Sequence, residues 1–271
     1  MANHSYVVTG GGRGIGRAVV ERLLGDAATA AVVAIELDPA ALGWARDDPR
    51  VLAVTGDAGD EAVTERAADL AESAGTLTGW VNNAAVFRDA SVHSAPASEV
   101  LGLVTANLGC ALAGCATAVR RFLAAGTARA RPGGAIVNVT SHQARRAVPG
   151  CTPYVTAKAA IEGLTRALAV EYGPRGIRVN AVAPGSVATE RYASFLASLE
   201  PAAAARVEAQ MAELHPLGRV AGAGEVADVI VYLLSDGASF VSGATVPVDG
   251  GRSVLARDPE AHDPGIDDGT G

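Results

Sequence analysis

The strongest constraint on the fold is a glycine-rich segment that lies between a short apolar run and a helical pattern. Residues 9–16 read Thr-Gly-Gly-Gly-Arg-Gly-Ile-Gly, directly after the apolar residues 6–8 and at the start of an amphipathic stretch. Glycines in this context let the backbone turn tightly and approach a phosphate, while the following helix offers amide groups and its positive dipole end to an anion. The segment predicts a dinucleotide-binding turn. Its expected contacts are Gly10, Gly12, Arg13, Gly14, Ile15 and Gly16.

Strand-like and helix-like patterns alternate along the rest of the chain. Seven short apolar runs predict buried parallel strands at 6–8, 31–35, 51–54, 80–81, 135–139, 178–182 and 245–248. Segments rich in Ala and Leu, with apolar residues three and four apart, predict helices at 15–24, 61–74, 99–124, 153–172 and 224–234. This alternation predicts an α/β fold, a Rossmann-type doubly wound, mostly parallel seven-stranded sheet flanked by helices.

The length and composition favour one domain. With 271 residues, of which 49% are hydrophobic and 19% charged, the chain is expected to bury one large core. Residues 1–251 are therefore interpreted as a single domain. The segment 186–219 breaks the alternation with helical patches around Glu200 and Pro201, which indicates a lid over a ligand. Residues 252–271, rich in Asp, Pro and Gly, are expected to form a loosely ordered polar tail or to lie on a neighbouring subunit.

Charge and cysteine content narrow the classes of function. The net charge of −7 argues against nucleic acid or an anionic membrane as partner, because both recruit basic surfaces. Cys110, Cys115 and Cys151 show neither metal-ligand spacing nor a disulfide framework, so no metal is expected and a reducing cytoplasm is the expected location. Secretion and membrane insertion are not expected, because the first residues lack the basic and apolar regions of a leader and no uninterrupted apolar run reaches membrane-spanning length.

Glu36 ends the second apolar run, twenty residues after Gly16. An acidic side chain at this position accepts hydrogen bonds from ribose hydroxyls and repels a 2′-phosphate, which favours NAD over NADP. Arg13 is the opposing observation, because a guanidinium in the turn can pair with a 2′-phosphate, although it can equally be a solvated loop cation. NAD is thus the expected cofactor, and NADP is the alternative.

Four polar residues form a candidate catalytic group. Tyr154 and Lys158 lie four residues apart near the start of a predicted helix, so both point to one face. A phenol titrates near pH 10, and positive charge from Lys158 and an oxidised nicotinamide ring is expected to lower that pKa. Ser141 follows the run 135–139, at a strand end where a parallel sheet presents ligand groups. Asn107 is expected to bend or interrupt its helix and to order a water beside Lys158.

Taken singly, each of these four residues has a purely structural interpretation. Together with the glycine segment they resemble the single-domain branch of the short-chain dehydrogenase/reductase family, over residues from about 5 to 251. Three further stretches support the resemblance: Thr55-Gly56-Asp57-Ala58, Asn82-Asn83-Ala84-Ala85, and Pro184-Gly185 followed by Val187 and Thr189. Ala85 departs from the family pattern, which has Gly there, and should be tolerated if the backbone is not left-handed.

The resemblance implies an enzyme acting on CH–OH donors with NAD or NADP, which interconverts a secondary alcohol and a ketone. Tyr154 would be the general acid and base, Ser141 would hold the reacting oxygen, and Lys158 would bind the nicotinamide ribose and pass protons through a water held by Asn107. The other implied cofactor contacts are Glu36, Asp57, Ala58, Asn83, Ala84, Ala85, Tyr154, Pro184, Gly185, Val187 and Thr189. The family also implies a homotetramer.

Substrate contacts are expected from the residues around the catalytic group and from the lid. They are Ser141, Gln143, Cys151, Tyr154, Arg191 and Tyr192, with His142, Val148, Phe195, Met211 and His215 as further candidates. The alternative function is a catalytically silent cofactor-binding subunit or sensor, against which the intact trio of Ser141, Tyr154 and Lys158 argues. A sugar-nucleotide epimerase or dehydratase would need a larger C-terminal domain. A small alcohol or ketone is therefore the expected partner.

Overall fold

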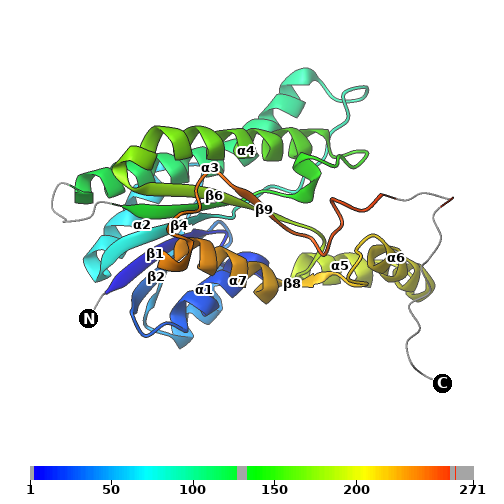
Figure 1. Ribbon diagram of the computed structural model, residues 1–271. Helices are drawn as coiled ribbons and strands as arrows, with labels where there is room; N and C mark the ends of the chain where they lie inside the picture. The colour runs from blue at the N-terminus through cyan, green and yellow to red at the C-terminus, as the bar shows by residue number, and fades with distance from the viewer. Residues whose placement is uncertain (1–2, 127–132, 257–259, 261–271) are drawn as a thin grey trace.

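Seven parallel strands form the central sheet of the computed structural model, which describes residues 3–126, 133–256 and 260 (Figure 1). The strand order is β3-β2-β1-β4-β5-β6-β9. The strands are β1 (His4–Thr9), β2 (Thr29–Glu36), β3 (Val51–Thr55), β4 (Thr76–Asn82), β5 (Gly134–Val139), β6 (Ile177–Pro184) and β9 (Thr245–Val248). All seven predicted strands are confirmed. The order reverses between β1 and β4, which is where ligands bind in open parallel sheets.

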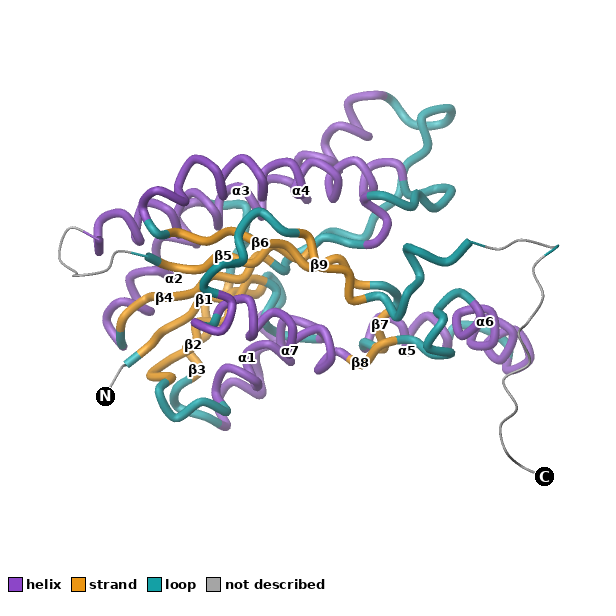
Figure 2. The backbone as a smooth tube through the Cα atoms, in the orientation of Figure 1, coloured by secondary structure: helices purple, strands orange, loops and turns teal. Residues whose placement is uncertain are grey.

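Helices cover both faces of the sheet (Figure 2). One face carries α1 (Gly14–Leu24) and α7 (Ala223–Leu234), and the other carries α2 (Glu61–Ala74), α3 (Ala97–Gly126) and α4 (Thr152–Tyr172). Short 3₁₀ helices lie at Pro39–Asp47, His142–Ala144, Gly173–Arg175 and Asp236–Ala238. The five predicted helices are confirmed, and each crossover returns the chain to a parallel strand.

The core consists of one apolar layer on each face of the sheet. Successive strand residues alternate between the layers: Val7 and Val33 pack with Trp80 under α2 and α3, whereas Val8 and Val32 pack under α1 and α7. All five side chains are fully buried. Strands buried on both faces read as continuous apolar runs, which is why the sequence marked them clearly.

Helix α3 is a long helix that packs against the sheet and two neighbouring helices. By length and composition its residues Ala97–Ala125 pass as a membrane span, with a mean hydropathy of 1.6 over 18 residues. One face of the helix packs on β4 and between α2 and α4, where Ala118 and Phe122 are completely buried. This packing accounts for the apolar character of that face.

The segment predicted as a lid projects from the carboxyl edge of the sheet (Figure 1). It contains β7 (Val187–Ala188), α5 (Glu190–Ala197), α6 (Pro201–Glu213) and, just after it, β8 (Ala221–Gly222), which pairs in parallel with β7. The two helices agree with the sequence pattern, but strands of two residues carry no periodic signal. Neither α5 nor α6 contains a buried residue. The lid is therefore only loosely packed on the domain.

The polar tail begins with residues that are bonded to the domain. The Arg252 guanidinium donates to the Ser186 hydroxyl at 2.8 Å, and Arg146 donates to the carbonyl of Ser253 at 3.0 Å. These contacts join the start of the tail to the lid and to the loop after β5. Residues 257–259 and 261–271 of the predicted tail lie outside the described residues.

Candidate active site

The glycine segment forms a tight turn between β1 and α1. Gly10 and Gly14 have φ of 63° and 54°, in the left-handed region that favours glycine. A side chain on Gly16 would overlap the carbonyl oxygen of Gly10. The Asn83 side chain donates to the carbonyls of Thr9 and Gly10 at 3.1 and 3.0 Å. The turn is thus a cradle in which side chains have no room. A bound diphosphate requires such a close approach to the backbone.

The residues after β4 shape this turn rather than leave free polar groups beside it. The Thr9 hydroxyl accepts the backbone amides of Asn83 and Ala84, both at 3.0 Å. The side-chain amide of Asn83 is already bonded to the carbonyls of Thr9 and Gly10. Among the described residues no non-glycine has a positive φ, so the methyl group of Ala85 meets no backbone conflict.

Two acidic side chains lie at the carboxyl end of β2. The Glu36 carboxylate accepts the amide of Gly12 at 3.1 Å and that of Leu37 at 2.9 Å. Arg13 forms an ion pair with Asp38, so it is not the unpaired loop cation that the sequence left open. The Glu36 Oε1 accepts a second amide, that of Asp38 at 3.4 Å, whereas the Oε2 that accepts Gly12 keeps a second lone pair for a ribose hydroxyl. The negative charge of Asp38 offsets the one guanidinium in the turn.

Other predicted cofactor contacts lie along the same edge of the sheet. Asp57 follows β3, and its carboxylate accepts the amide of Gly59 at 2.8 Å. Pro184 ends β6, and the amide of Gly185 donates to the Val248 carbonyl at 3.0 Å. The backbone there is so close to β9 that a side chain on Gly185 would approach the Asp249 Cα to 2.9 Å.

The lid residue Thr189 caps a helix in this structure. Its hydroxyl accepts the amide of Tyr192 at 3.4 Å and so caps the N-terminus of α5. Val187, two residues earlier, pairs with Ala221 in the two-stranded sheet.

The fold brings Ser141, Tyr154 and Lys158 together. Ser141 follows β5 and caps a 3₁₀ helix, where its Oγ accepts the amide of Gln143 at 3.1 Å. Tyr154 and Lys158 lie in the first two turns of α4, with the Lys158 Nζ 5.4 Å from the centre of the Tyr154 ring. The buried Lys158 Nζ donates to the Val139 carbonyl at 2.7 Å. A hydroxyl, a phenol and an ammonium group therefore meet at the end of β5.

Protonation at this cluster differs from the expectation. Burial raises the pKa of Tyr154 to about 12, against the lowering effects of a hydrogen bond with Ser141 and the positive charge of Arg191. Burial lowers the pKa of Lys158 to about 8. The predicted lowering of the phenol by Lys158 is thus not realised by the chain alone, because desolvation outweighs the nearby positive charge.

Phe87 is a site residue that the sequence did not indicate. Its ring centre is 5.5 Å from that of Tyr154, and the Arg191 guanidinium carbon lies over the Phe87 ring, 4.3 Å from its centre. Phe87 is 55% exposed. The available signal was an aromatic residue shortly after β4, at the sheet edge that also presents Ser141.

Asn107 does not interrupt its helix. Helix α3 is continuous from Ala97 to Gly126, and the Asn107 side chain bonds to the backbone of Val86 and Leu103. Both hydrogens of its amide group are donated to carbonyls. The expected bend is absent because the Asn107 side chain bonds both to the Leu103 carbonyl within the helix and to Val86 in the neighbouring loop.

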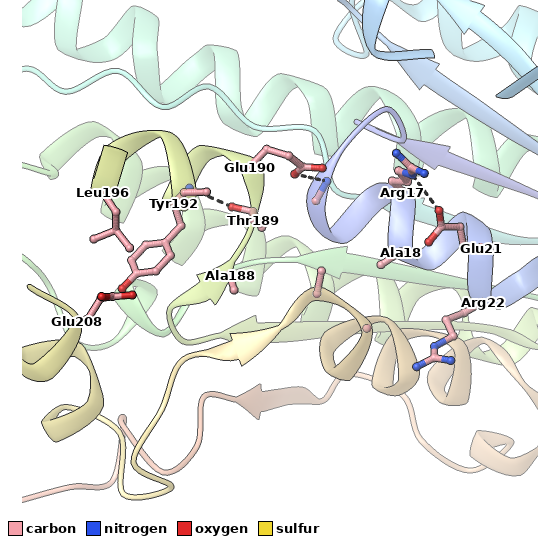
Figure 3. Close-up of a pocket in the computed structure, with 14 residues that line it drawn as sticks. Arg17, Ala18, Glu21, Arg22, Ala188, Thr189, Glu190, Tyr192, Leu196 and Glu208 are labelled. Carbon is pink, nitrogen blue, oxygen red and sulfur yellow. Dashed lines mark hydrogen bonds and ion pairs between the residues drawn. The ribbon is translucent and has the colours of Figure 1, made fainter. Parts of the chain in front are cut away.

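The predicted substrate residues separate into two groups. Gln143 and Cys151 flank the catalytic cluster, and the Gln143 Oε1 is buried without a hydrogen-bond partner in the described chain. Tyr192 instead lines an outer hollow of about 840 Å³, where it lies beside Glu208 and Leu196 (Figure 3). Neither Ser141 nor Tyr154 lines that hollow. The first turn of α5 stands between the two places.

Two histidines considered from sequence lie behind the site. Burial lowers the pKa of His142 to about 4, and its Nδ1 is 3.2 Å from the Pro184 carbonyl. The His215 Nε2 accepts the amide of Ser186 at 3.2 Å, so it joins the two ends of the lid.

Known proteins share this arrangement over nearly the whole chain. A family model described as Enoyl-(Acyl carrier protein) reductase matches residues 10–253. Levodione reductase of Leifsonia aquatica is 33% identical over 255 residues, which cover 92% of this chain and 93% of the relative. Cis-4-hydroxycyclohexanecarboxylate dehydrogenase of Sinomonas cyclohexanicum is 39% identical over 264 residues, covering 94% and 98%.

A solved structure agrees as well. The ligand-free aldohexose dehydrogenase of Thermoplasma acidophilum matches with a TM-score of 0.82 and 26% identity, covering 97% of this chain and 98% of that one. The chain therefore belongs to the short-chain dehydrogenase/reductase family, and it is an oxidoreductase of the class that acts on CH–OH groups with a nicotinamide cofactor.

Proposed function

We propose that the protein interconverts a secondary alcohol and a ketone with NAD, and that Tyr154 is the general acid and base. The observation that carries this proposal is the convergence of three groups: the Ser141 hydroxyl acts on the pKa of the Tyr154 phenol, and the Lys158 Nζ lies 5.4 Å from the centre of the Tyr154 ring. A pure binding protein has no need for two hydroxyl groups that converge on one oxygen position. The non-catalytic alternative is therefore disfavoured.

The chain supplies the proton chemistry. Ser141 and Tyr154 would both hydrogen-bond the reacting oxygen, and in oxidation Tyr154 would take the proton of the alcohol. Bound nicotinamide supplies the hydride acceptor. From a pKa of about 12, ionising the phenol near pH 8 costs about 5 kcal/mol. That value already includes the lowering effect of the Arg191 charge, so in oxidation a bound, oxidised nicotinamide ring would have to lower the Tyr154 pKa further, whereas in reduction the neutral phenol is already the proton donor.

Asn107 receives a different role in this proposal from the one that the sequence suggested. Because its side chain is bonded to Val86, we assign it the task of holding the loop that carries Phe87. Phe87 in turn packs against Tyr154. Asn107 would then act on the catalytic phenol through packing rather than through a water molecule.

NAD is the proposed cofactor. Support comes from Glu36, whose carboxylate lies at the end of β2 against Gly12, and from the pairing of Arg13 with Asp38. A 2′-phosphate at this place would meet two carboxylates and a guanidinium that is already paired. Electrostatic repulsion therefore disfavours NADP.

A cyclic secondary alcohol or ketone is the proposed substrate class. The names of the three relatives above contain a cyclic diketone, a ring alcohol with a carboxylate, and a sugar. In this chain Phe87 offers an apolar wall, Gln143 a buried oxygen acceptor and Arg191 a cation. An apolar ring with one polar or anionic substituent fits this combination.

The test is a turnover assay with purified protein. Levodione, cis-4-hydroxycyclohexanecarboxylate and an aldohexose are offered with NAD or NADH, and in parallel with NADP or NADPH, while the absorbance of the reduced nicotinamide is followed. Turnover that disappears in Tyr154→Phe supports the proposal. Tight NADH binding without turnover of any ring alcohol or ketone would favour the non-catalytic alternative.

The proposed assembly is a homotetramer. Leu101 and Leu112 on α3, Val170 on α4 and Phe240 near the last strand are exposed large apolar side chains. Contact with further copies of the chain would cover them. Light scattering coupled to size-exclusion chromatography gives the mass in solution, and a monomeric mass would contradict this part of the proposal.

A further inference from the structure

The structure assigns a cofactor-affinity role to Glu190, the first residue of α5. We propose that its carboxylate occupies the diphosphate position of the glycine turn and competes with the cofactor for it. The proposal rests on the proposed function, since it takes the turn to be the cofactor site. It concerns a residue that neither the glycine pattern nor the catalytic trio includes.

The contact itself is direct. The Glu190 Oε2 accepts the backbone amide of Gly14 at 3.0 Å, and Figure 3 shows the side chain pointing toward the start of α1. Gly14 is the first residue of α1, which has eleven residues and no acidic residue of its own in the first turn. An amide at a helix N-terminus attracts an anion, and here a carboxylate from the lid fills that position.

The neighbouring residue closes the same place sterically. A Cβ atom on Gly14 would lie 3.1 Å from the Thr189 Cγ2 and 3.7 Å from the Glu190 Oε2, so side chains of the lid lie directly against the turn. Space for a diphosphate between the turn and the lid requires the first turn of α5 to move away. Cofactor binding must then break the bond between Glu190 and Gly14.

Within the part of the chain that the structure describes, no ion pair joins Glu190 to a basic side chain. Arg17, the nearest arginine along α1 that lines the hollow, is paired with Glu21 at 2.8 Å. Within the described chain the hydrogen bond of the Glu190 side chain goes to Gly14. Because α5 and α6 bury no residue, few other contacts oppose the displacement of the lid.

The Glu190 carboxylate therefore weakens binding of the cofactor. A ligand diphosphate must displace the carboxylate, and any carboxylate that remains nearby repels it. Removing the charge should therefore tighten binding of every ligand that carries a diphosphate. Binding of a ligand without phosphate should not change.

The experiment measures the affinity of ADP-ribose and of adenosine by calorimetry for the full chain. The variants are Glu190→Gln and, as a matched control, Glu208→Gln. Glu208 lies in the same hollow beside Tyr192 and away from the glycine turn (Figure 3). We expect Glu190→Gln to bind ADP-ribose roughly two- to tenfold more tightly than wild type. Glu208→Gln should match wild type, and adenosine should bind all three proteins equally.

Failure of the inference and failure of the proposed function give different results. If wild type and Glu190→Gln bind ADP-ribose equally, or the variant binds more weakly, Glu190 does not compete and the proposed function still stands. If none of the proteins binds ADP-ribose, the proposed cofactor site is wrong and the inference falls with it. Should Glu190→Gln fail to fold, Glu190→Ala removes both the charge and the contact with Gly14 at an exposed position and must also tighten ADP-ribose binding.

Discussion

The side chain of Asn107 holds both backbone polar groups of Val86. Its Oδ1 accepts the Val86 amide at 3.0 Å, and its Nδ2 donates to the Val86 carbonyl at 3.1 Å. Asn107 is 2% exposed, so water does not replace these bonds. A residue in the middle of α3 thereby fixes the loop that places Phe87 against Tyr154.

Asn107→Ala should therefore reduce both stability and substrate affinity. Leaving the Val86 groups unpaired is expected to cost about 1–3 kcal/mol of the free energy of unfolding. The KM should rise more than kcat falls, because the Phe87 loop loses its support. Urea unfolding and steady-state kinetics measure the two effects.

A matched control lies far from the site. The buried Asn180 donates to the Val241 carbonyl at 2.8 Å and accepts the Ala244 amide at 3.1 Å. Asn180→Ala should lose comparable stability with an unchanged KM. If Asn107→Ala instead keeps its stability while kcat collapses, the water-holding role predicted from sequence is the better one.

Lys158→Met should stabilise the protein while it destroys activity. Burial lowers the pKa of Lys158 to about 8, compared with about 10.4 for a free lysine, so the folded state holds a charge at a cost of about 3 kcal/mol below pH 8. Between those two pH values the unfolded chain still binds the proton and the folded chain does not. Stability from this group therefore rises with pH across that window.

The difference in unfolding free energy between wild type and Lys158→Met isolates this contribution. It should favour the variant most near pH 7 and shrink as the pH approaches 10. A difference that does not depend on pH would show that Lys158 is not a buried cation. Loss of the 2.7 Å bond to the Val139 carbonyl affects both ends of the pH range equally.

The fold was predictable because the strands are buried on both faces. Runs such as 31–35 and 135–139 have no polar face, so their apolar character alone marked the sheet, and the glycine turn fixed its first crossover. The strands of two residues in the lid had no such signal.

The relative positions of site residues were predictable only where both residues lie on one helix, because their spacing in sequence then sets which face they share. Tyr154 and Lys158 are four apart on one helix, so their shared face followed from sequence. Phe87, Glu190 and the Asn107 to Val86 bonds depend on contacts between distant elements, which no local pattern encodes. The effect of burial on the Tyr154 pKa could not be predicted for the same reason, since burial depends on the whole fold.

Gly16→Ala should abolish cofactor binding. The added methyl group would overlap the Gly10 carbonyl, so the turn must open and lose the geometry of the cradle. Gly109→Ala, on α3, is the control, because a Cβ there has no neighbour within 4 Å. That control should keep NADH affinity and gain about 0.5–1 kcal/mol of stability from the better helix propensity of Ala. NADH fluorescence titration decides, and normal binding by Gly16→Ala would remove the turn from the proposal.

Glu36→Gln should narrow the preference for NAD. The substitution keeps an oxygen acceptor for Gly12 but removes a charge worth about 1 kcal/mol against a 2′-phosphate, or roughly a fivefold change in the affinity ratio. Asp38→Asn should add to this effect by freeing Arg13. Glu21→Gln, an exposed position on α1, is the control. Equal ratios of NADH to NADPH affinity in all variants would contradict the assignment.

Tyr154→Phe tests the chemistry most directly, because the ring that packs against Phe87 stays and only the hydroxyl is lost. The expected result is a fall in kcat of about 10²–10⁴-fold or more, with NADH affinity nearly unchanged. Tyr172→Phe, at the far end of the same helix, should behave as wild type. The loss should appear in both directions, since the phenol gives its proton in reduction and takes one in oxidation. If Tyr154→Phe retains a tenth of the activity or more, the proton comes from another group, and the proximity of Ser141 to Tyr154 is structural rather than catalytic.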